Sequence, residues 1–475
     1  MICPRDSDKT PAKWVDSFSR SFNRTHYSGL IMDLTIQIFF DGQWHDAAIV
    51  QLAHAERGHT SSSRVGYEIQ YFVDFGAEFL ADGQPVRGLR AYSVAAPIDL
   101  EDRSVETWPP FLLDFIPQGR QAKRIAEFLE IKPDAPSSQI ELLKRSAGSP
   151  VGNLRIKEAY AREAERVREL VRVGVSMEAI LARDPTFLEV ADHFSMLASG
   201  SNGLQGDWPK VAMTQSTDGL WYPSSMVDDR DARAFVIAKL LRSGEATDKR
   251  ILEAEAGYSK VARVFGLDVH GVNSYGDGVL VVPRFDREVS KDGLIRYGQE
   301  SLTSALGIAE FGARGRHETY LKLVQEVSAD PLRDTVEYIL RDMLNLAMGN
   351  PDNHGRNTAL RKFPDGTVRL APLFDFAPMR IDASAIPRST TWECMRKSNR
   401  DTNPDWREVC EAVAAPTVPV DQLMKALAVK EDLLRGLPDI ARRNGVPESV
   451  IEYVIVKNEE LADGVAKLKN APSDG

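Results

Sequence analysis

The chain has 475 residues, of which 43% are hydrophobic and 27% are charged, and its formal net charge is −10. This length exceeds what one hydrophobic core usually holds, so two or three packed units are expected. The acidic balance excludes nucleic-acid binding through the overall field of the protein and leaves a local basic patch as the remaining route.

No run of the sequence approaches the roughly 18 apolar residues that a membrane helix needs, and the polar N-terminus lacks the apolar core of a signal peptide. The three cysteines, Cys3, Cys394 and Cys410, are far apart and form no CxxC pair. This spacing favours reduced thiols over a disulfide framework or a zinc site. The sequence therefore predicts a soluble, cytoplasmic protein without membrane contact.

The first part of the chain is expected to be a strand-rich N-terminal subdomain, residues 1–135. Residues 34–40 (LTIQIFF) alternate apolar and polar side chains and are followed by the turn signal Asp41-Gly42. Residues 65–73 (VGYEIQYFV) have a similar β-type composition.

Residues 136–190 are expected to form a helical connector. Pro133 and Pro136, with two serines after them, indicate a linker at its start. Apolar positions in residues 143–174 recur at three- and four-residue spacing among Ala, Glu, Arg and Leu, which is typical of a helix.

Residues 191–290 are expected to form a small lobe with an antiparallel sheet. Short β-type runs are separated by Asp and Gly, namely VAMTQ, GLWYPSS, AFVIAKLL and GVLVVPRF. A helical pattern at 251–266 lies between the last two and ends at Gly266. Because residues 291–475 are mainly helical in pattern, the sequence predicts an α+β fold with a large helical C-terminal lobe.

The most informative stretch is MGNPDNHGRNTALRKFPDGTVRLAPLFDF, residues 348–376. Asn357 follows Asp352 at the spacing of the protein-kinase catalytic loop, and a predicted hairpin then leads to Asp375. Phosphoryl transfer needs one carboxylate beside the acceptor hydroxyl, and a second carboxylate with an amide oxygen to hold magnesium on the phosphates. We therefore interpret Asp352 as the base, and Asn357 and Asp375 as Mg²⁺ ligands beside ATP. A polar loop and hairpin on an unrelated fold is the competing interpretation, which His354 and the second aspartate make weaker.

Upstream residues fit the same interpretation. Lys239 lies late in an apolar strand, and the next helix carries Glu253 and Glu255, which is the order of the phosphate-binding lysine and its glutamate partner in kinases. Each of these residues also has a non-functional explanation. Lys239 could be a strand-end lysine that reaches solvent, and the glutamates could lie on a solvated helix face. The order in which the lysine and the glutamates precede Asp352 favours the functional interpretation.

A glycine-rich segment, ASGSNGLQGDWPK at residues 198–210, precedes the first strands of the small lobe. Gly203 and Gly206 would let backbone N–H groups approach phosphates, and Lys210 would add positive charge. Such loops are common in proteins, so its position before the sheet is the informative feature.

Residues 195–380 resemble the HipA family, bacterial serine/threonine kinases that act as toxins of toxin–antitoxin modules. Five motifs carry this resemblance in the order of the family: EAGYSKVARVFGL, VVPRFDR, RYGQESLTSALG, GNPDNHGRN and LAPLFDF. The segment AGSPVGNLRIKEA is also similar to the YjjJ-like subgroup of that family. The resemblance implies a bilobal, protein-kinase-like fold with ATP between the lobes, and it places the family's N-terminal subdomain in the strand-rich first part.

The resemblance also implies roles for individual residues. Asp352 would be the base, Lys239 would bind phosphate, and the helix motif selects Glu255 over Glu253 as its partner. His354 would belong to the catalytic loop, although a histidine that packs the loop together explains it equally well. Asn357 and Asp375 would be the Mg²⁺ ligands.

Two departures from the family pattern stand out. Gly203 occupies the place of the phosphate-loop serine and Trp208 that of a glutamine, so self-phosphorylation there would have to use Ser199 or Ser201 or be absent. The second departure is Pro351, which restricts the preceding residue to extended geometry.

The leading hypothesis is a serine/threonine kinase toxin that arrests growth by phosphorylating a translation component. In the family such targets include aminoacyl-tRNA synthetases, and a helix-turn-helix antitoxin usually binds the toxin; direct nucleic-acid binding is not expected. A small-molecule kinase of related fold is one alternative. A non-catalytic antitoxin or repressor-complex subunit is another, and it would predict decay of the catalytic residues.

Overall fold

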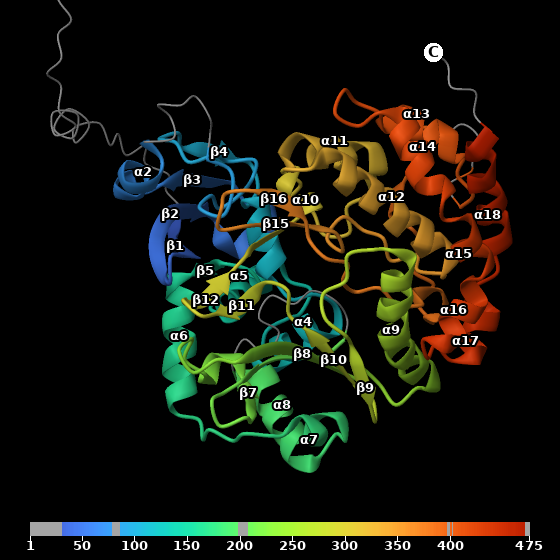
Figure 1. Ribbon diagram of the computed structural model, residues 1–475. Helices are drawn as coiled ribbons and strands as arrows, with labels where there is room; N and C mark the ends of the chain where they lie inside the picture. Colours follow the sequence, from blue (N-terminus) through green and yellow to red (C-terminus); the bar gives the residue numbers. More distant parts are fainter. Residues whose placement is uncertain (1–30, 78–85, 198–207, 397–399, 401, 471–475) are drawn as a thin grey trace, which may run out of the picture.

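The computed structural model describes residues 31–77, 86–197, 208–396, 400 and 402–470. The helices and strands of these residues form an α+β fold, as the sequence predicts. Figure 1 shows the N-terminal part of the chain (blue), a small lobe (green) and a helical C-terminal part (orange to red) as neighbouring bodies.

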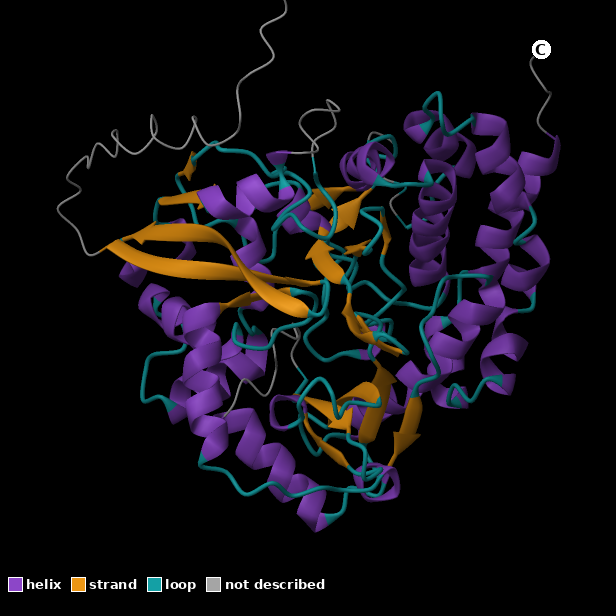
Figure 2. Ribbon diagram, turned by 60° about the vertical axis from the view of Figure 1, so that its left-hand side comes forward, coloured by secondary structure: helices purple, strands orange, loops and turns teal. Residues whose placement is uncertain are grey.

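The N-terminal part is built on a five-stranded sheet in the order β4-β3-β2-β1-β5. Its strands are β1 (Ile31–Phe40), β2 (Gln43–Ala53), β3 (Ser63–Tyr67), β4 (Arg103–Val105) and β5 (Leu154–Ile156). The long β1–β2 hairpin is the most extended strand pair in Figure 2. Asp41 and Gly42 form its turn with φ of 51° and 76°, the left-handed conformation that tight two-residue hairpin turns require.

Residues 65–73 are strand only in part, which corrects the expectation. β3 ends at Tyr67, and the helix α2 (Ile69–Phe75) follows it. Phe75 of this helix packs edge-on against Phe40 of the sheet, with ring centroids 4.9 Å apart. Aromatic packing of this kind outweighs the β-type composition of the segment.

The expected helical connector also contains a strand. Residues 143–174 hold the end of α5 (Pro136–Ser146), a loop, the strand β5 and α6 (Lys157–Arg168). Pro136, expected in a linker, is the first residue of α5, where its missing N–H costs no helical hydrogen bond. Because β5 pairs with β1, this segment completes the N-terminal sheet, and unit boundaries at residues 135, 190 and 290 stay a prediction. Shorter elements around it are η1 (Ala55–Thr60), η2 (Pro110–Phe115), α4 (Gly119–Phe128), α7 (Met177–Leu181) and α8 (Pro185–Leu197).

The small lobe contains a second five-stranded sheet, in the order β7-β6-β8-β10-β9. The strands expected from the sequence are present: β6 (Lys210–Gln215), β7 (Trp221–Pro223), β8 (Ala234–Leu240) and β10 (Val279–Pro283), with β9 (Ser274–Gly276) at the edge and η3 (Ser224–Met226) after β7. The helix α9 (Ala246–Phe265) ends at Gly266, whose φ of 94° is a left-handed C-cap that glycine adopts without strain.

Further short strands follow the small lobe along the chain. They are β11 (Arg287–Ser290) with β12 (Gly293–Arg296), the three-stranded sheet of β13 (Gly298–Ser301), β15 (Ala359–Lys362) and β16 (Val368–Leu370), and the pair of β14 (Gly315–Arg316) with β17 (Thr390–Thr391). The predicted hairpin is therefore formed by β15 and β16, with Pro364–Thr367 between them.

The C-terminal part is helical, and its helices gather on one side of the molecule in both ribbon views (Figures 1 and 2). They are α10 (Leu302–Ala305), α11 (His317–Val327), α12 (Pro331–Ala347), η4 (Met379–Ile381), α13 (Trp406–Val413), α14 (Val420–Ala428), α15 (Glu431–Arg435), α16 (Leu437–Arg443), α17 (Glu448–Val454), α18 (Asn458–Ala466) and η5 (Lys467–Asn470). One apolar core joins them to α9 and includes the fully buried Trp392 and Trp406. Within the described ranges, no helix is long and apolar enough to cross a membrane.

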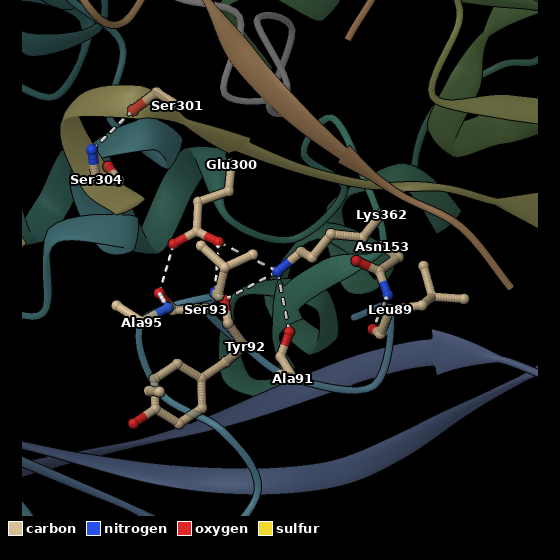
Figure 3. A network of polar contacts seen from close by, with 12 residues as sticks. Leu89, Ala91, Tyr92, Ser93, Ala95, Asn153, Glu300, Ser301, Ser304 and Lys362 are labelled. Carbon is tan, nitrogen blue, oxygen red and sulfur yellow. Dashed lines mark hydrogen bonds and ion pairs between the residues drawn. The ribbon is translucent and has the colours of Figure 1, made fainter. Parts of the chain in front are cut away.

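A buried polar network connects the N-terminal part to the sheet of β13, β15 and β16 (Figure 3). Lys362 of β15 is fully buried and donates to the backbone oxygen of Ala91 at 3.0 Å. Glu300 of β13 accepts from the hydroxyl of Ser93 at 2.5 Å and from the backbone N–H of Val94 at 2.9 Å. Buried charges are tolerated when they are paired and hydrogen-bonded in this way.

Candidate active site

A cleft lies where the small lobe, the region around the β15–β16 hairpin and the N-terminal part meet. Its empty volume, including the part open to solvent, is about 1260 Å³. Residues around it include Lys210, Ile237, Lys239 and Glu255 of the small lobe, Arg284, Phe285 and Asp286 after β10, Asn357, Phe374 and Asp375 around the hairpin, and Asp114, Phe115 and Val151 of the N-terminal part. Most of the residues expected at the site therefore share one cavity.

Lys239 is a buried cation of the cleft. It points from β8 and is 5% exposed. Its Nζ donates to Oε1 of Glu255 at 2.5 Å and also to Oδ1 of Asp375. Although burial alone would lower the pKa of Lys239, the carboxylates of Asp375 and Glu255 outweigh it and raise that pKa. The ammonium group is therefore charged at neutral pH.

The glutamate that faces Lys239 is Glu255 and not Glu253. Glu255 lies on the inner face of α9 and is 4% exposed, whereas Glu253 is half-buried two residues earlier on the helix. Burial raises the pKa of Glu255, and the charge of Lys239 opposes that rise. The position of Glu255 lets it hold the lysine when Asp375 is engaged elsewhere.

Asp352 lies in the loop after α12, beside a smaller hollow that shares Asn357 and Asp375 with the cleft. Nε2 of His354 is 3.4 Å from its Oδ1, and Nδ2 of Asn357 donates to its backbone oxygen at 3.1 Å. Burial raises the pKa of Asp352, while the charge of His354 acts in the opposite direction and that of Asp375 adds to the rise. A carboxylate with a raised pKa is better suited to accept a proton near neutral pH.

Asp375 has an unusual backbone. Its φ is 54°, in the left-handed region that costs a residue with a side chain about 1–2 kcal/mol. Burial would raise the pKa of Asp375, but the nearby Lys210 and Lys239 lower it below its usual range. The strained conformation thus aims an ionised carboxylate into the cleft, and such strain is common at functional sites.

The donor atoms of the cleft fit Mg²⁺. Among the residues that the structure describes, no cluster of three or more His, Cys, Asp or Glu side chains could hold a metal alone. Mg²⁺ on a nucleotide needs less, because it is usually bound by one or two carboxylates together with phosphate oxygens. Asp375 offers an ionised carboxylate and Asn357 an amide oxygen at the same wall.

Lys210 opens β6 opposite Lys239 in the register of the sheet. It is 4% exposed, and its Nζ is 3.9 Å from Oδ2 of Asp375. Burial lowers the pKa of Lys210, and Asp375 opposes this shift. Gly203 and Gly206, expected in the phosphate loop before it, lie outside the described residues.

Comparison with known proteins decides the family. A model of the HipA-like C-terminal domain matches residues 202–433. A relative from Sinorhizobium fredii, Putative kinase Y4mE, is 30% identical over 392 residues, which cover 75% of this chain and 87% of the relative. The chain belongs to the HipA family. The resemblance carried by the five motifs is thereby confirmed, while the narrower YjjJ-like assignment stays a prediction.

The HipA fold extends over nearly the whole chain. The HipA protein of Shewanella oneidensis MR-1, solved in a toxin–antitoxin complex with HipB and operator DNA, aligns with a TM-score of 0.60. The alignment covers 92% of this chain and 99% of that protein at 14% identity. The N-terminal sheet therefore belongs to the shared HipA fold.

The HipA-type motif RFDR forms a buried ionic cluster at the wall of the cleft. Asp286 accepts from Nε and Nη2 of Arg284 at 2.8 and 2.6 Å and from the backbone N–H of Gly152 at 2.9 Å. Burial would raise the pKa of Asp286, but Arg284 and Arg287 lower it below its usual range. The cluster fixes the segment that presents Phe285 to the cleft, and it ties that segment to the N-terminal part.

Sequence reasoning missed a second cluster, centred on Arg242. Nε and Nη2 of Arg242 donate to Oδ1 of Asp248 at 2.9 and 2.7 Å, and Nη2 also donates to Asp382. The guanidinium lies 4.7 Å from the ring centroid of Trp208. One side chain thus joins the end of β8, the start of α9 and the segment after Asp375. The only hint in the sequence was Trp208, which departs from the family pattern. The pairing of Arg242 with Asp382 gave no local signal, because 140 residues separate them.

Proposed function

We propose that this HipA-family protein is an ATP- and Mg²⁺-dependent serine/threonine protein kinase with Asp352 as its base. The observation that carries the proposal is that Lys239 contacts Glu255 and Asp375 together. A lysine held by a helix glutamate beside a metal-binding aspartate is the arrangement that protein kinases use for phosphoryl transfer. The name of the Sinorhizobium relative, a kinase, supports the same activity.

In the proposed mechanism the residues of the chain bind the phosphates, orient the reactants and take a proton from the acceptor hydroxyl. Lys239 and Lys210 attract the phosphates, and Asp375 with Asn357 would hold Mg²⁺, which would supply positive charge beside the phosphate oxygens. The acceptor hydroxyl oxygen forms the new bond to phosphorus, and the bond from phosphorus to the β–γ bridging oxygen breaks. Asp352 takes the hydroxyl proton.

His354 is proposed to act on Asp352. Its Nε2 is 3.4 Å from Oδ1 of that carboxylate, close enough to orient it once the loop tightens around substrate, since catalytic contacts are often long before ligands bind. Packing the loop is the alternative role. A glutamine at position 354 separates the two, because it keeps a polar side chain and loses the imidazole ring.

The acceptor and partner belong to the same proposal. We expect a serine or threonine of a translation component, such as an aminoacyl-tRNA synthetase, and growth arrest in the cytoplasm as the outcome. A helix-turn-helix antitoxin is the proposed partner, supported by the complex in which the Shewanella HipA was solved. That partner would supply any contact with DNA, because the net charge of −10 disfavours direct binding by this chain.

Phosphoproteomics after brief induction tests the proposal and names the acceptor. Cells that express the wild type should gain phosphoserine or phosphothreonine on a small set of proteins, and cells that express Asp352→Asn should not. Asp365→Asn in the exposed hairpin turn is the matched control and should behave as wild type. New phosphate on a small metabolite would favour a small-molecule kinase, and toxicity without any phosphorylation would favour a non-catalytic binding protein.

A further inference from the structure

The catalytic loop contains an ion pair that reaches into the N-terminal part. Arg356 lies directly before Asn357, and its side chain is 5% exposed. Its Nη1 donates to Oδ1 of Asp114, which belongs to η2 and is 242 residues away in the sequence. The same nitrogen also donates to the hydroxyl of Ser304 at 3.1 Å. The loop that carries the proposed base is therefore held by a carboxylate from another part of the fold.

Asp114 holds a second segment of the site at the same time. It accepts from the backbone N–H of Ser301 at 3.1 Å and from its hydroxyl at 2.8 Å. Ser301 follows Glu300, which together with Lys362 forms the network of Figure 3. Contacts with the N-terminal part thus lie within the catalytic loop, at Arg356, and on the strand β15 that follows it.

We propose that Asp114 is a positioning residue, through which the N-terminal part sets the geometry of the catalytic loop. The inference rests on the proposed kinase function. Its chain of contacts is short: Asp114 fixes Arg356, Arg356 adjoins Asn357, and Nδ2 of Asn357 donates to the backbone oxygen of Asp352 at 3.1 Å. One carboxylate therefore constrains both the proposed base and a proposed Mg²⁺ ligand.

The charge of the pair matters as well as its shape. Asp114 and Arg356 line the same cleft as Asn357 and Asp375. Removal of the Asp114 carboxylate leaves the Arg356 guanidinium without its charged partner in a buried place, which is more damaging than removal of both charges. The released cation then faces the cleft where Mg²⁺ is proposed to bind, so the enzyme needs more Mg²⁺.

Hydrogen–deuterium exchange of the full-length protein without nucleotide tests the positioning directly. In Asp114→Asn, peptides that cover residues 350–358 should exchange about tenfold faster or more, because a buried charge has lost its partner. Asp102→Asn is the matched control, since it breaks an exposed ion pair with Arg64 in the same part of the chain. It should leave those peptides unchanged.

A double variant separates positioning from general damage. Asp114→Asn combined with Arg356→Gln should exchange more slowly in residues 350–358 than Asp114→Asn alone, and its Mg²⁺ requirement should return towards that of the wild type. If Asp114→Asn does not fold, Arg356→Gln replaces it in the comparison with the wild type. Wild-type exchange rates in a single variant, or a double variant no better than Asp114→Asn, would overturn the inference. Absence of phosphoryl transfer by the wild type would instead refute the kinase proposal and leave the exchange result standing.

Discussion

Glu255→Gln perturbs the centre of the cleft with little change in shape. In the structure Lys239 is shared between Glu255 and Asp375. In the proposed mechanism Asp375 would leave the lysine to bind Mg²⁺, and Glu255 would be the partner that keeps Lys239 in place. With glutamine at position 255, Lys239 loses that charged partner, so it holds Asp375 more firmly and competes with Mg²⁺.

The size of the effect follows from the burial of the pair. The side chains of Lys239 and Glu255 are 6% and 5% exposed, so their interaction is screened little. A hydrogen bond that involves charged groups contributes about 1.5–3 kcal/mol. This converts to a change of roughly 10- to 150-fold in an equilibrium at 1.4 kcal/mol per factor of ten.

The assay is the dependence of the transfer rate on Mg²⁺ at saturating ATP. The Mg²⁺ concentration at half-maximal rate should rise by roughly tenfold or more in Glu255→Gln. Glu253→Gln, two residues earlier on the half-buried face of α9, is the matched control and should stay at the wild-type value. Equal Mg²⁺ dependence of the two variants would refute the reasoning.

Further predictions concern the base and the stability of the lobes. Asp352→Asn should lower kcat by a factor of about 10²–10⁴. Because burial raises the pKa of Asp352, activity should fall as acid protonates it at a higher pH than an ordinary aspartate, and the pH–rate profile checks this. Asp382→Asn removes a partner of Arg242 at a 2% exposed side chain, so it should lower the free energy of unfolding by about 3 kcal/mol in urea titration. Gly349→Ala should destabilise by at least about 1 kcal/mol in the same assay, because φ is 64° and a Cβ would lie 2.8 Å from Cβ of Val454. Wild-type unfolding midpoints for these last two variants would contradict the packing described.

Local patterns were sufficient for the parts of the fold that depend on neighbouring residues. The hairpin β15–β16, the strand that carries Lys239 and the glycine stop of α9 all follow from short-range signals, namely turn residues, apolar alternation and a C-cap. The sequence spacing of Asp352, Asn357 and Asp375 likewise placed candidates that the structure brings to one region.

Contacts between distant segments could not be read in the same way. The helix α2 forms because Phe75 packs on Phe40, and β5 is a strand because β1 offers it an edge. The ion pair of Asp114 with Arg356 joins residues 242 apart, and each looks like an ordinary surface charge in the sequence. The sequence motif that contains Glu300 was recognised. Its role in connecting the N-terminal part to β15 could not be predicted, because that role depends on the burial of Lys362.

The most direct test of the account is phosphate transfer by the purified, full-length protein from Mg-ATP labelled at the γ-position to a protein acceptor. The wild type and Asp365→Asn should transfer label to serine or threonine, and Asp352→Asn should lose the transfer while its unfolding midpoint stays unchanged. Undiminished transfer by Asp352→Asn, or none by the wild type in the presence of its acceptor, would contradict it.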